Sequence, residues 1–196
     1  MNNYEYIIAS LPVLQPGFRG QLDAASVLEE IRSQLSEADA AALDFLLDGW
    51  KCECLTEEFY AKAAASRNAF IKNYLFYDLQ LRNAKVAWLN KALGRPEGQD
   101  VMPCGDDDFE DAAKALEILS GTDILGRERG LDDLLWKHIE ELTEMHVFDL
   151  DVILGFAARL QIVARWLKLD ETTGREMFGR LVREMKENKP DNNTTL

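Results

Sequence analysis

The chain has 196 residues, enough for one large domain or two small ones, and its 47% hydrophobic and 29% charged fractions are ordinary for a globular protein. A net charge of −13 argues against nucleic acid and anionic lipid headgroups as partners, because both require a basic face. Five prolines and twelve glycines are few for a chain of many β-turns. Composition therefore favours an all-α protein.

The cysteines and the first residues bear on the compartment. Three cysteines are an odd number without a second matching pair, so a disulfide framework is not expected: Cys52, Cys54 and Cys104. The apolar run at 6–9 lacks a basic flank and meets Pro12 too early for a signal peptide. No stretch of about twenty apolar residues could form a transmembrane span. The expected location is the cytoplasm.

The N-terminal quarter predicts a short apolar element and two helices. Residues 4–11 form a short apolar element that ends at Pro12. Asp23 is a suitable N-cap for a helix that continues to Leu35. Ser36 is a suitable N-cap for the next helix, with Asp39 three positions later as a partial capping box, and this helix ends near Gly49.

The most informative element is an uninterrupted segment at about 56–94. Thr56 is a good N-cap, and Gly94 followed by Pro96 is a clear stop. Between them, apolar residues recur every three or four positions in two neighbouring stripes, as on an amphipathic helix. A helix of this length would extend about 57 Å. It either spans the molecule or breaks once near 66–68.

The second half begins with a candidate linker at 96–108, which holds three consecutive aspartates at its end. A helix is predicted at 107–119, then a loop marked by glycines, then a helix at 131–146. The loop glycines are Gly121, Gly126 and Gly130. The helix at 149–168, capped by Asp149, is apolar on most of its circumference and should be buried.

The last elements are a helix at 170–188 and a polar tail at 190–196 that we expect to be disordered. The coarse organisation is two helical halves, 1–97 and 98–189. The fold class predicted is a multi-helix bundle with one very long amphipathic helix and one buried apolar helix.

Clusters of metal-binding and catalytic residue types do not form a recognised site. His138 and His146 lack the Glu-x-x-His spacing of a di-iron bundle. Cys-x-Cys at 52–54 has no second pair for zinc, and Asp106–Asp108 lacks the alternation of a calcium loop. We therefore predict no catalytic residue, metal or cofactor. One enzyme alternative stays open, a helical site built from a cluster of acids and one imidazole: Glu140, Glu141, Glu144 and His146.

Two segments carry a family pattern. The first runs from Tyr77 to Lys85 and on to Leu93-Gly94-Arg95, and the second starts at Ile153-Leu154-Gly155-Phe156 and ends with Arg165, Leu167 and Lys168. Both resemble the C/d family of stalk proteins in V-type and archaeal-type ATPases. The family's Lys-Glu-x-Glu in the second segment is absent, and the chain is short for the family. The opening 3–12 looks closer to a divergent bacterial group encoded alongside V-type ATPase subunits.

The resemblance implies an all-helical, non-catalytic part that couples the membrane rotor ring to the central stalk in ion transport. Its partners would be other V-type ATPase subunits, and it would be cytoplasmic and peripherally membrane-associated through them. The residues expected to fix helix register or contact a partner are Asp78, Asn83, Lys85 and Arg165. The alternative function is a free-standing cytosolic helical adaptor or regulator that binds a partner protein.

Overall fold

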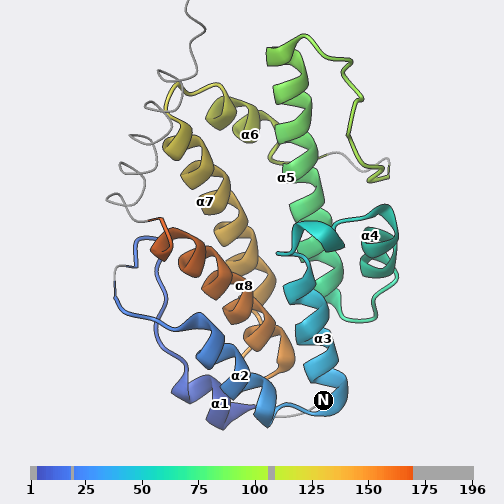
Figure 1. Cartoon of the computed structure of the whole chain (residues 1–196). Helices are drawn as coiled ribbons and strands as arrows, with labels where there is room; N and C mark the ends of the chain where they lie inside the picture. The colour runs from blue at the N-terminus through green and yellow to red at the C-terminus, as the bar shows by residue number, and fades with distance from the viewer. Residues whose placement is uncertain (1–3, 19, 106–108, 170–196) are drawn as a thin grey trace, which may run out of the picture.

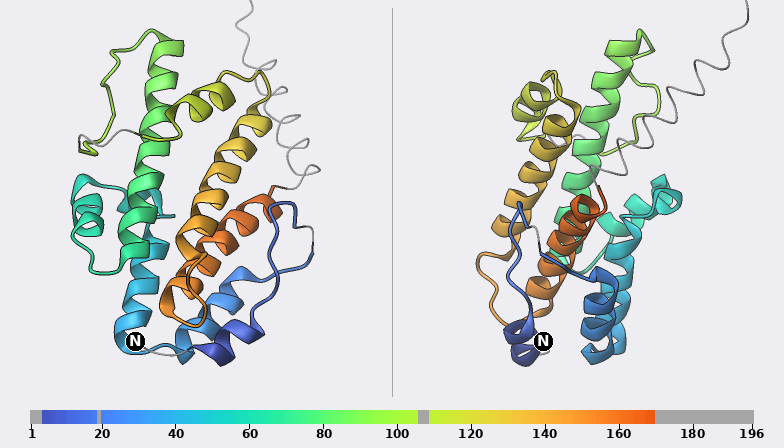
Figure 2. Two further views of the ribbon diagram at one scale, coloured as in Figure 1. Left: turned by 180° about the vertical axis from the view of Figure 1, so that it is seen from behind. Right: turned by 60° about the vertical axis from the view of Figure 1, so that its left-hand side comes forward.

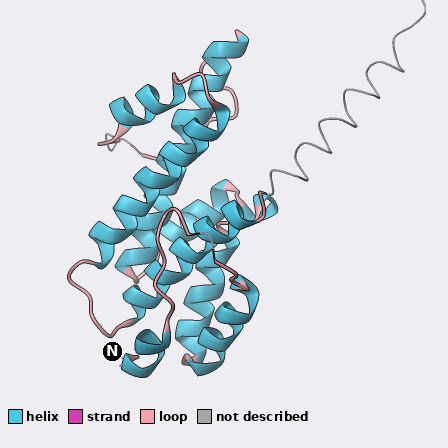
Figure 3. Cartoon of the chain, turned by 90° about the vertical axis from the view of Figure 1, so that its left-hand side faces the viewer, coloured by secondary structure: helices cyan, strands magenta, loops and turns pink. Residues whose placement is uncertain are grey.

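The computed structural model describes residues 4–18, 20–105 and 109–169, and within them every regular element is helical (Figures 1 and 3). The all-α prediction is confirmed. The elements are α1 (Glu5–Ser10), α2 (Ala24–Gln34), α3 (Glu37–Asp48), a short 3-10 turn (Cys52–Cys54), α4 (Glu57–Ala64), α5 (Ala69–Leu93), α6 (Ala112–Leu119), α7 (Ile124–Thr143) and α8 (Leu150–Leu167). None of these helices is long and apolar enough to cross a membrane.

Side-chain caps start α2, α3 and α4 where the sequence predicts them. Asp23 accepts hydrogen bonds from the backbone N–H groups of residues 25 and 26, and Ser36 accepts from Asp39 at 3.2 Å. Thr56 accepts from Phe59 at 3.2 Å. Each bond satisfies one of the amide groups that the first helical turn leaves without an intrahelical partner. These boundaries are therefore set by local chemistry.

The segment at 56–94 breaks once, at the expected place. α4 ends at Ala64, and α5 starts again after Asn68, whose side-chain oxygen accepts from the backbone N–H of Ile71 at 2.8 Å. α5 then runs for 25 residues, about 37 Å at the usual rise. It stops at Gly94, whose φ of 65° is the left-handed conformation that closes helix C-termini. The break lets α4 fold back against the first half of α5.

The glycine loop predicted at 121–130 is wrong in its second half. α7 begins at Ile124 and contains both Gly126 and Gly130. Asp123 caps it by accepting from the backbone N–H of Gly126 at 3.0 Å. A Cβ on Gly130 would lie 2.7 Å from a methyl group of Ile118, so this glycine permits the close approach of α6 and α7. The helix also ends earlier than the predicted 146, at Thr143.

α8 is the buried apolar helix that the sequence predicts. In the right-hand view of Figure 2 it lies between α7 and the pair α2 and α3, and it also contacts α5. Ile153, Leu154 and Leu160 are completely buried. Helices from residues 1–97 and from 98–189 contribute to one hydrophobic core. The close-packed interior therefore joins the two segments along α5 and α8.

Some predicted elements lie outside the described residues. They are the aspartates at 106–108, which the helix predicted at 107–119 would include, the helix at 170–188 and the tail at 190–196. Residues 109–111 are described and not helical, so α6 begins at Ala112, later than predicted.

Candidate functional site

Six charged side chains line a small cleft between α5, α7 and α8. Its volume is about 110 Å³. Three of the four residues singled out by the resemblance lie in it, from two helices distant in sequence: Asp78, Lys85 and Arg165. The other charged members are Arg82, Glu128 and Asp132. The cleft thus holds three carboxylates and three cations, and each is paired.

The pair within α5 is Asp78 and Arg82. Arg82 Nε donates to Asp78 Oδ2 at 2.6 Å, and the Tyr60 hydroxyl donates to the same oxygen at 3.3 Å. Burial raises the pKa of the Asp78 carboxyl, although the Arg82 charge opposes this shift. Burial and the nearby carboxylate also raise the pKa of the Tyr60 phenol. The contact connects α4 to the middle of α5.

The pair that connects α7 and α8 is Asp132 and Arg165. Asp132 is 5% exposed, and its Oδ2 accepts from Arg165 Nη2 and, at 2.6 Å, from the indole N–H of Trp166. The Arg129 guanidinium lies over the Trp166 ring, 3.9 Å from its centroid. A buried carboxylate with two donors from the neighbouring helix fixes the register of α8 on α7.

The pair that connects α5 and α7 is Lys85 and Glu128, whose Nζ and Oε1 are in direct contact. Both side chains remain about one-third exposed, so water screens their attraction. We expect this pair to contribute less to stability than Asp132 does.

Asn83 faces away from the cleft and holds the connection after α5. Its amide donates to the carbonyl of Met102 at 2.8 Å and accepts from the N–H of Met102 at 3.0 Å. Two turns further along, the buried Asn90 donates to the carbonyl of Gln99 at 2.6 Å. These two amides attach the 94–105 segment to α5 through its backbone.

The sequence did not identify three residues of this cleft: Arg82, Glu128 and Asp132. A signal for Arg82 existed, because a carboxylate and an arginine four positions apart on a helix face each other. Asp132 follows Leu131 and precedes Leu134 and Leu135 on the apolar side of its helix. A charge on an apolar face needs a partner, but which helix supplies that partner depends on tertiary packing.

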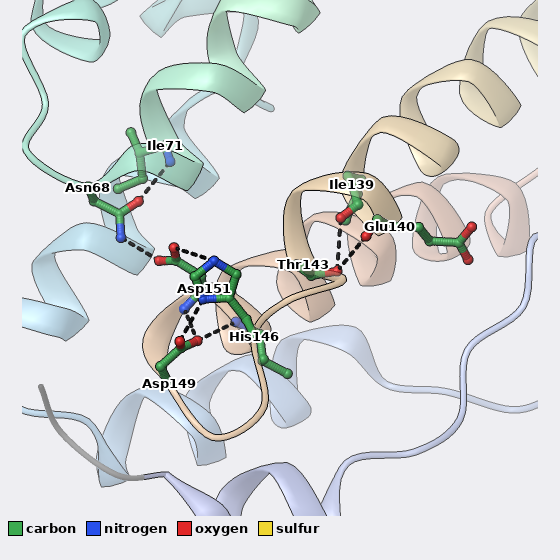
Figure 4. A network of polar contacts seen from close by, with 9 residues as sticks. Asn68, Ile71, Ile139, Glu140, Thr143, His146, Asp149 and Asp151 are labelled. Carbon is green, nitrogen blue, oxygen red and sulfur yellow. Dashed lines mark hydrogen bonds and ion pairs between the residues drawn. The ribbon is translucent and has the colours of Figure 1, made fainter.

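A second polar network lies at the start of α8 (Figure 4). His146 Nδ1 is 2.6 Å from Asp149 Oδ2, and its Nε2 is 3.7 Å from Asp151 Oδ2. Asn68, the cap of α5, donates to Asp151 Oδ1 at 2.6 Å. The network therefore joins the loop after α7, the first turn of α8 and the break between α4 and α5.

The acid and imidazole cluster considered as an enzyme site is not assembled. Glu140 accepts from the indole of Trp136 at 2.8 Å, and Glu141 pairs with Lys137 at 2.9 Å. His146 instead contacts the two aspartates of α8. Among the described residues, no group of three or more histidine, cysteine, aspartate or glutamate side chains could hold a metal ion. The three cysteines are free thiols.

The two histidines should give opposite pH dependences of stability. The hydrogen bond to Asp149 raises the pKa of His146 above its usual 6.5. The stability that the His146–Asp149 contact adds is therefore fully present below pH 6.5, and it is lost as the pH rises through the folded-state pKa of His146. Burial lowers the pKa of His138, which stacks on Tyr77, so its contribution is present above pH 6.5 and is lost as the pH falls.

We therefore expect His146→Gln to lower the melting temperature at pH 5.5 by about 2 °C more than at pH 8, the scale for a partly exposed pair. His138→Gln should show the reverse slope, with its larger loss at pH 8. Melting curves followed by circular dichroism at both pH values would measure this. Parallel slopes for the two variants would contradict the assignment.

Asp78→Ala is expected to lower the free energy of unfolding by about 1 kcal/mol. The loss is modest because Arg82 stays 41% exposed and can be solvated, and because burial of the Asp78 carboxylate is itself unfavourable. Urea denaturation gives the measurement. The matched control is Asp48→Ala, which removes an exposed carboxylate paired with Lys51 and should cost less. Equal losses would contradict this account.

Comparison with known proteins gives one family. Residues 104–189 are similar to the family described as "Protein of unknown function (DUF2764)". That range includes α6, α7 and α8 and thus the Asp132 and Arg165 side of the cleft. No curated protein and no solved structure matches the chain.

Proposed function

We propose that the chain is a non-catalytic part of a proton- or sodium-translocating V-type ATPase, related to the C/d family and placed between the membrane rotor ring and the central stalk. The observation that carries the proposal is the convergence of three resemblance residues, Asp78, Lys85 and Arg165, on one cleft lined by ion pairs. They come from the two segments that resemble the family, α5 and α8.

A part that transmits torque needs stiffness. The paired charges of the cleft connect α5, α7 and α8, and one close-packed core runs beneath them. Such a core deforms little under load because its side chains have few alternative arrangements. The polar residues of the resemblance thus act on helix register, which supports a mechanical rather than a chemical role.

The acidic surface supports a basic partner. With a net charge of −13, the chain would attract a positively charged protein of the stalk and orient it during encounter. Such attraction contributes more to specificity and association rate than to affinity. Assembly should therefore weaken as the ionic strength increases.

Purification of the tagged chain from detergent-solubilised membranes of its native host tests the proposal. We expect V-type ATPase subunits to co-purify at low salt and to be partly lost at about 0.5 M salt, where exposed charges are strongly screened. The matched control is the tagged Asp132→Ala variant, which should recover fewer subunits if helix register matters for assembly. Recovery of no ATPase subunit would refute the proposal.

The second candidate is an adaptor or regulator that binds a partner protein. It is favoured by an open, largely apolar groove of about 480 Å³ between α5 and α6. A chain found only in the soluble fraction, with no ATPase subunit attached, would select this candidate.

A further inference from the structure

The groove is lined by the second half of α5 and by α6. These two segments lie at the same end of the molecule (Figure 1). Its floor is made of small and apolar side chains from the two helices: Ala84, Ala87, Trp88, Ala112, Leu116 and Leu119. The alanines leave the backbone of both helices open to close approach. A groove of this volume and composition suits the apolar face of a helix.

Among the large apolar side chains that line the groove, Leu116 is the exposed one. It is 56% exposed on α6, whereas Leu119, one turn away, is 2% exposed. Burying Leu116 and the half-buried Trp88 beneath a partner would remove apolar area from water, which is the main favourable term in association. Contiguous apolar surface with a polar border is typical of interaction sites.

The border of the groove is positively charged. Lys91 and Arg95 line it beside one acid, Glu97. Arg127 lies over the Trp88 ring, 4.8 Å from the centroid, and its buried Nε has no hydrogen-bond partner among the described residues. None of the ion pairs between described residues involves these three cations. Such a local cluster of cations on a strongly acidic chain calls for an acidic ligand.

We infer that this groove binds an amphipathic helix of a partner protein, with apolar residues at helical spacing and carboxylates along both flanks. The apolar face would cover Leu116 and Trp88. The flanking carboxylates would pair with Lys91, Arg95 and Arg127, of which arginine can hold a carboxylate through two parallel hydrogen bonds. A partner of this chemistry is compatible with either proposed function.

The test places a photo-crosslinking amino acid, p-benzoylphenylalanine, at Leu116 in the native host. We expect a crosslink to one segment of another protein that carries net negative charge and apolar residues at i, i+3 or i+4, and i+7. The same amino acid at Val13, an exposed position outside the groove, should not give that crosslink. Attachment to a basic segment, to a lipid, to a second copy or to the chain itself would overturn the inference, as would no crosslink.

Charge reversal provides the matched comparison. Lys91→Glu with Arg95→Glu should reduce the crosslink about tenfold, since attraction becomes repulsion. Lys62→Glu with Lys72→Glu changes the net charge of the chain equally at exposed positions outside the groove and should leave the crosslink unchanged. Unchanged circular dichroism spectra would show that both variants fold. Equal reduction by both pairs would overturn the inference.

The outcomes also separate this inference from the ATPase proposal. An acidic amphipathic segment from a protein outside the ATPase would support the groove and count against the ATPase role. Co-purified ATPase subunits without a crosslink at Leu116 would support the ATPase role and overturn the proposed helix-binding groove.

Discussion

Asp132→Ala should lower the free energy of unfolding by about 2–3 kcal/mol, a large effect for a single polar residue. The substitution removes the acceptor for Arg165 Nη2 and for the indole N–H of Trp166. Breaking a buried ion pair commonly costs about 3–5 kcal/mol. The expectation here is lower because the Arg165 side chain is 43% exposed and can recover some hydration.

Urea denaturation of the purified chain, followed by circular dichroism, measures this loss. Asp133→Ala is the matched control, because Asp133 is the exposed neighbour on the same helix. It should change stability by about 0.5 kcal/mol or less. Asp132→Asn keeps an oxygen for the Trp166 indole but loses the charge, so it should fall between the two. A loss for Asp132→Ala no larger than the control would show that the pair does not hold α8 in register.

Gly155→Ala should destabilise the protein by about 1–2 kcal/mol, although alanine ordinarily favours helices over glycine. A Cβ at Gly155 of α8 would lie 2.5 Å from the Thr143 methyl and 3.4 Å from a methyl of Ile139, both of α7. Thr143 cannot turn away freely, because its hydroxyl donates to the Ile139 carbonyl at 2.9 Å (Figure 4). The clash therefore has to be relieved by separating the helices.

A compensating change gives the sharper test. Thr143→Ser removes the methyl that the new Cβ would meet and keeps the hydroxyl. In that background Gly155→Ala should cost much less, and it could become stabilising by up to about 1 kcal/mol through helix propensity. The coupling between the two substitutions, measured as a double-mutant cycle, should exceed about 1 kcal/mol. Additive effects would show that the close approach of α7 and α8 at this point is not limiting.

The candidate site was only partly predictable. Asp78, Lys85 and Arg165 were singled out by the resemblance to the C/d family, and all three line the cleft, whereas Asn83 does not. Their partners could not be derived in the same way. Arg82 follows from helical spacing, but Glu128 and Asp132 come from α7, and nothing local indicates that α7 lies against both α5 and α8.

The glycines also show which features local sequence can predict and which depend on tertiary packing. Gly94 ends α5 because a glycine adopts a positive φ without steric cost, whatever surrounds it. Gly126 and Gly130 looked equivalent in sequence, yet they lie within α7. Unlike Gly94, Gly130 is explained by packing, because it lies against Ile118 of α6, a separate helix.

The sequence by itself determined the net charge, the helical class and most helix starts. The last two were predictable because capping and periodicity involve residues within a few positions of one another. Thr56, Asn68 and Asp149 act in this way. Only the tertiary structure decided which polar side chains meet in the cleft and which apolar side chains remain open between α5 and α6. Those outcomes depend on how close whole helices approach, and that distance is set by many side chains together rather than by any local pattern.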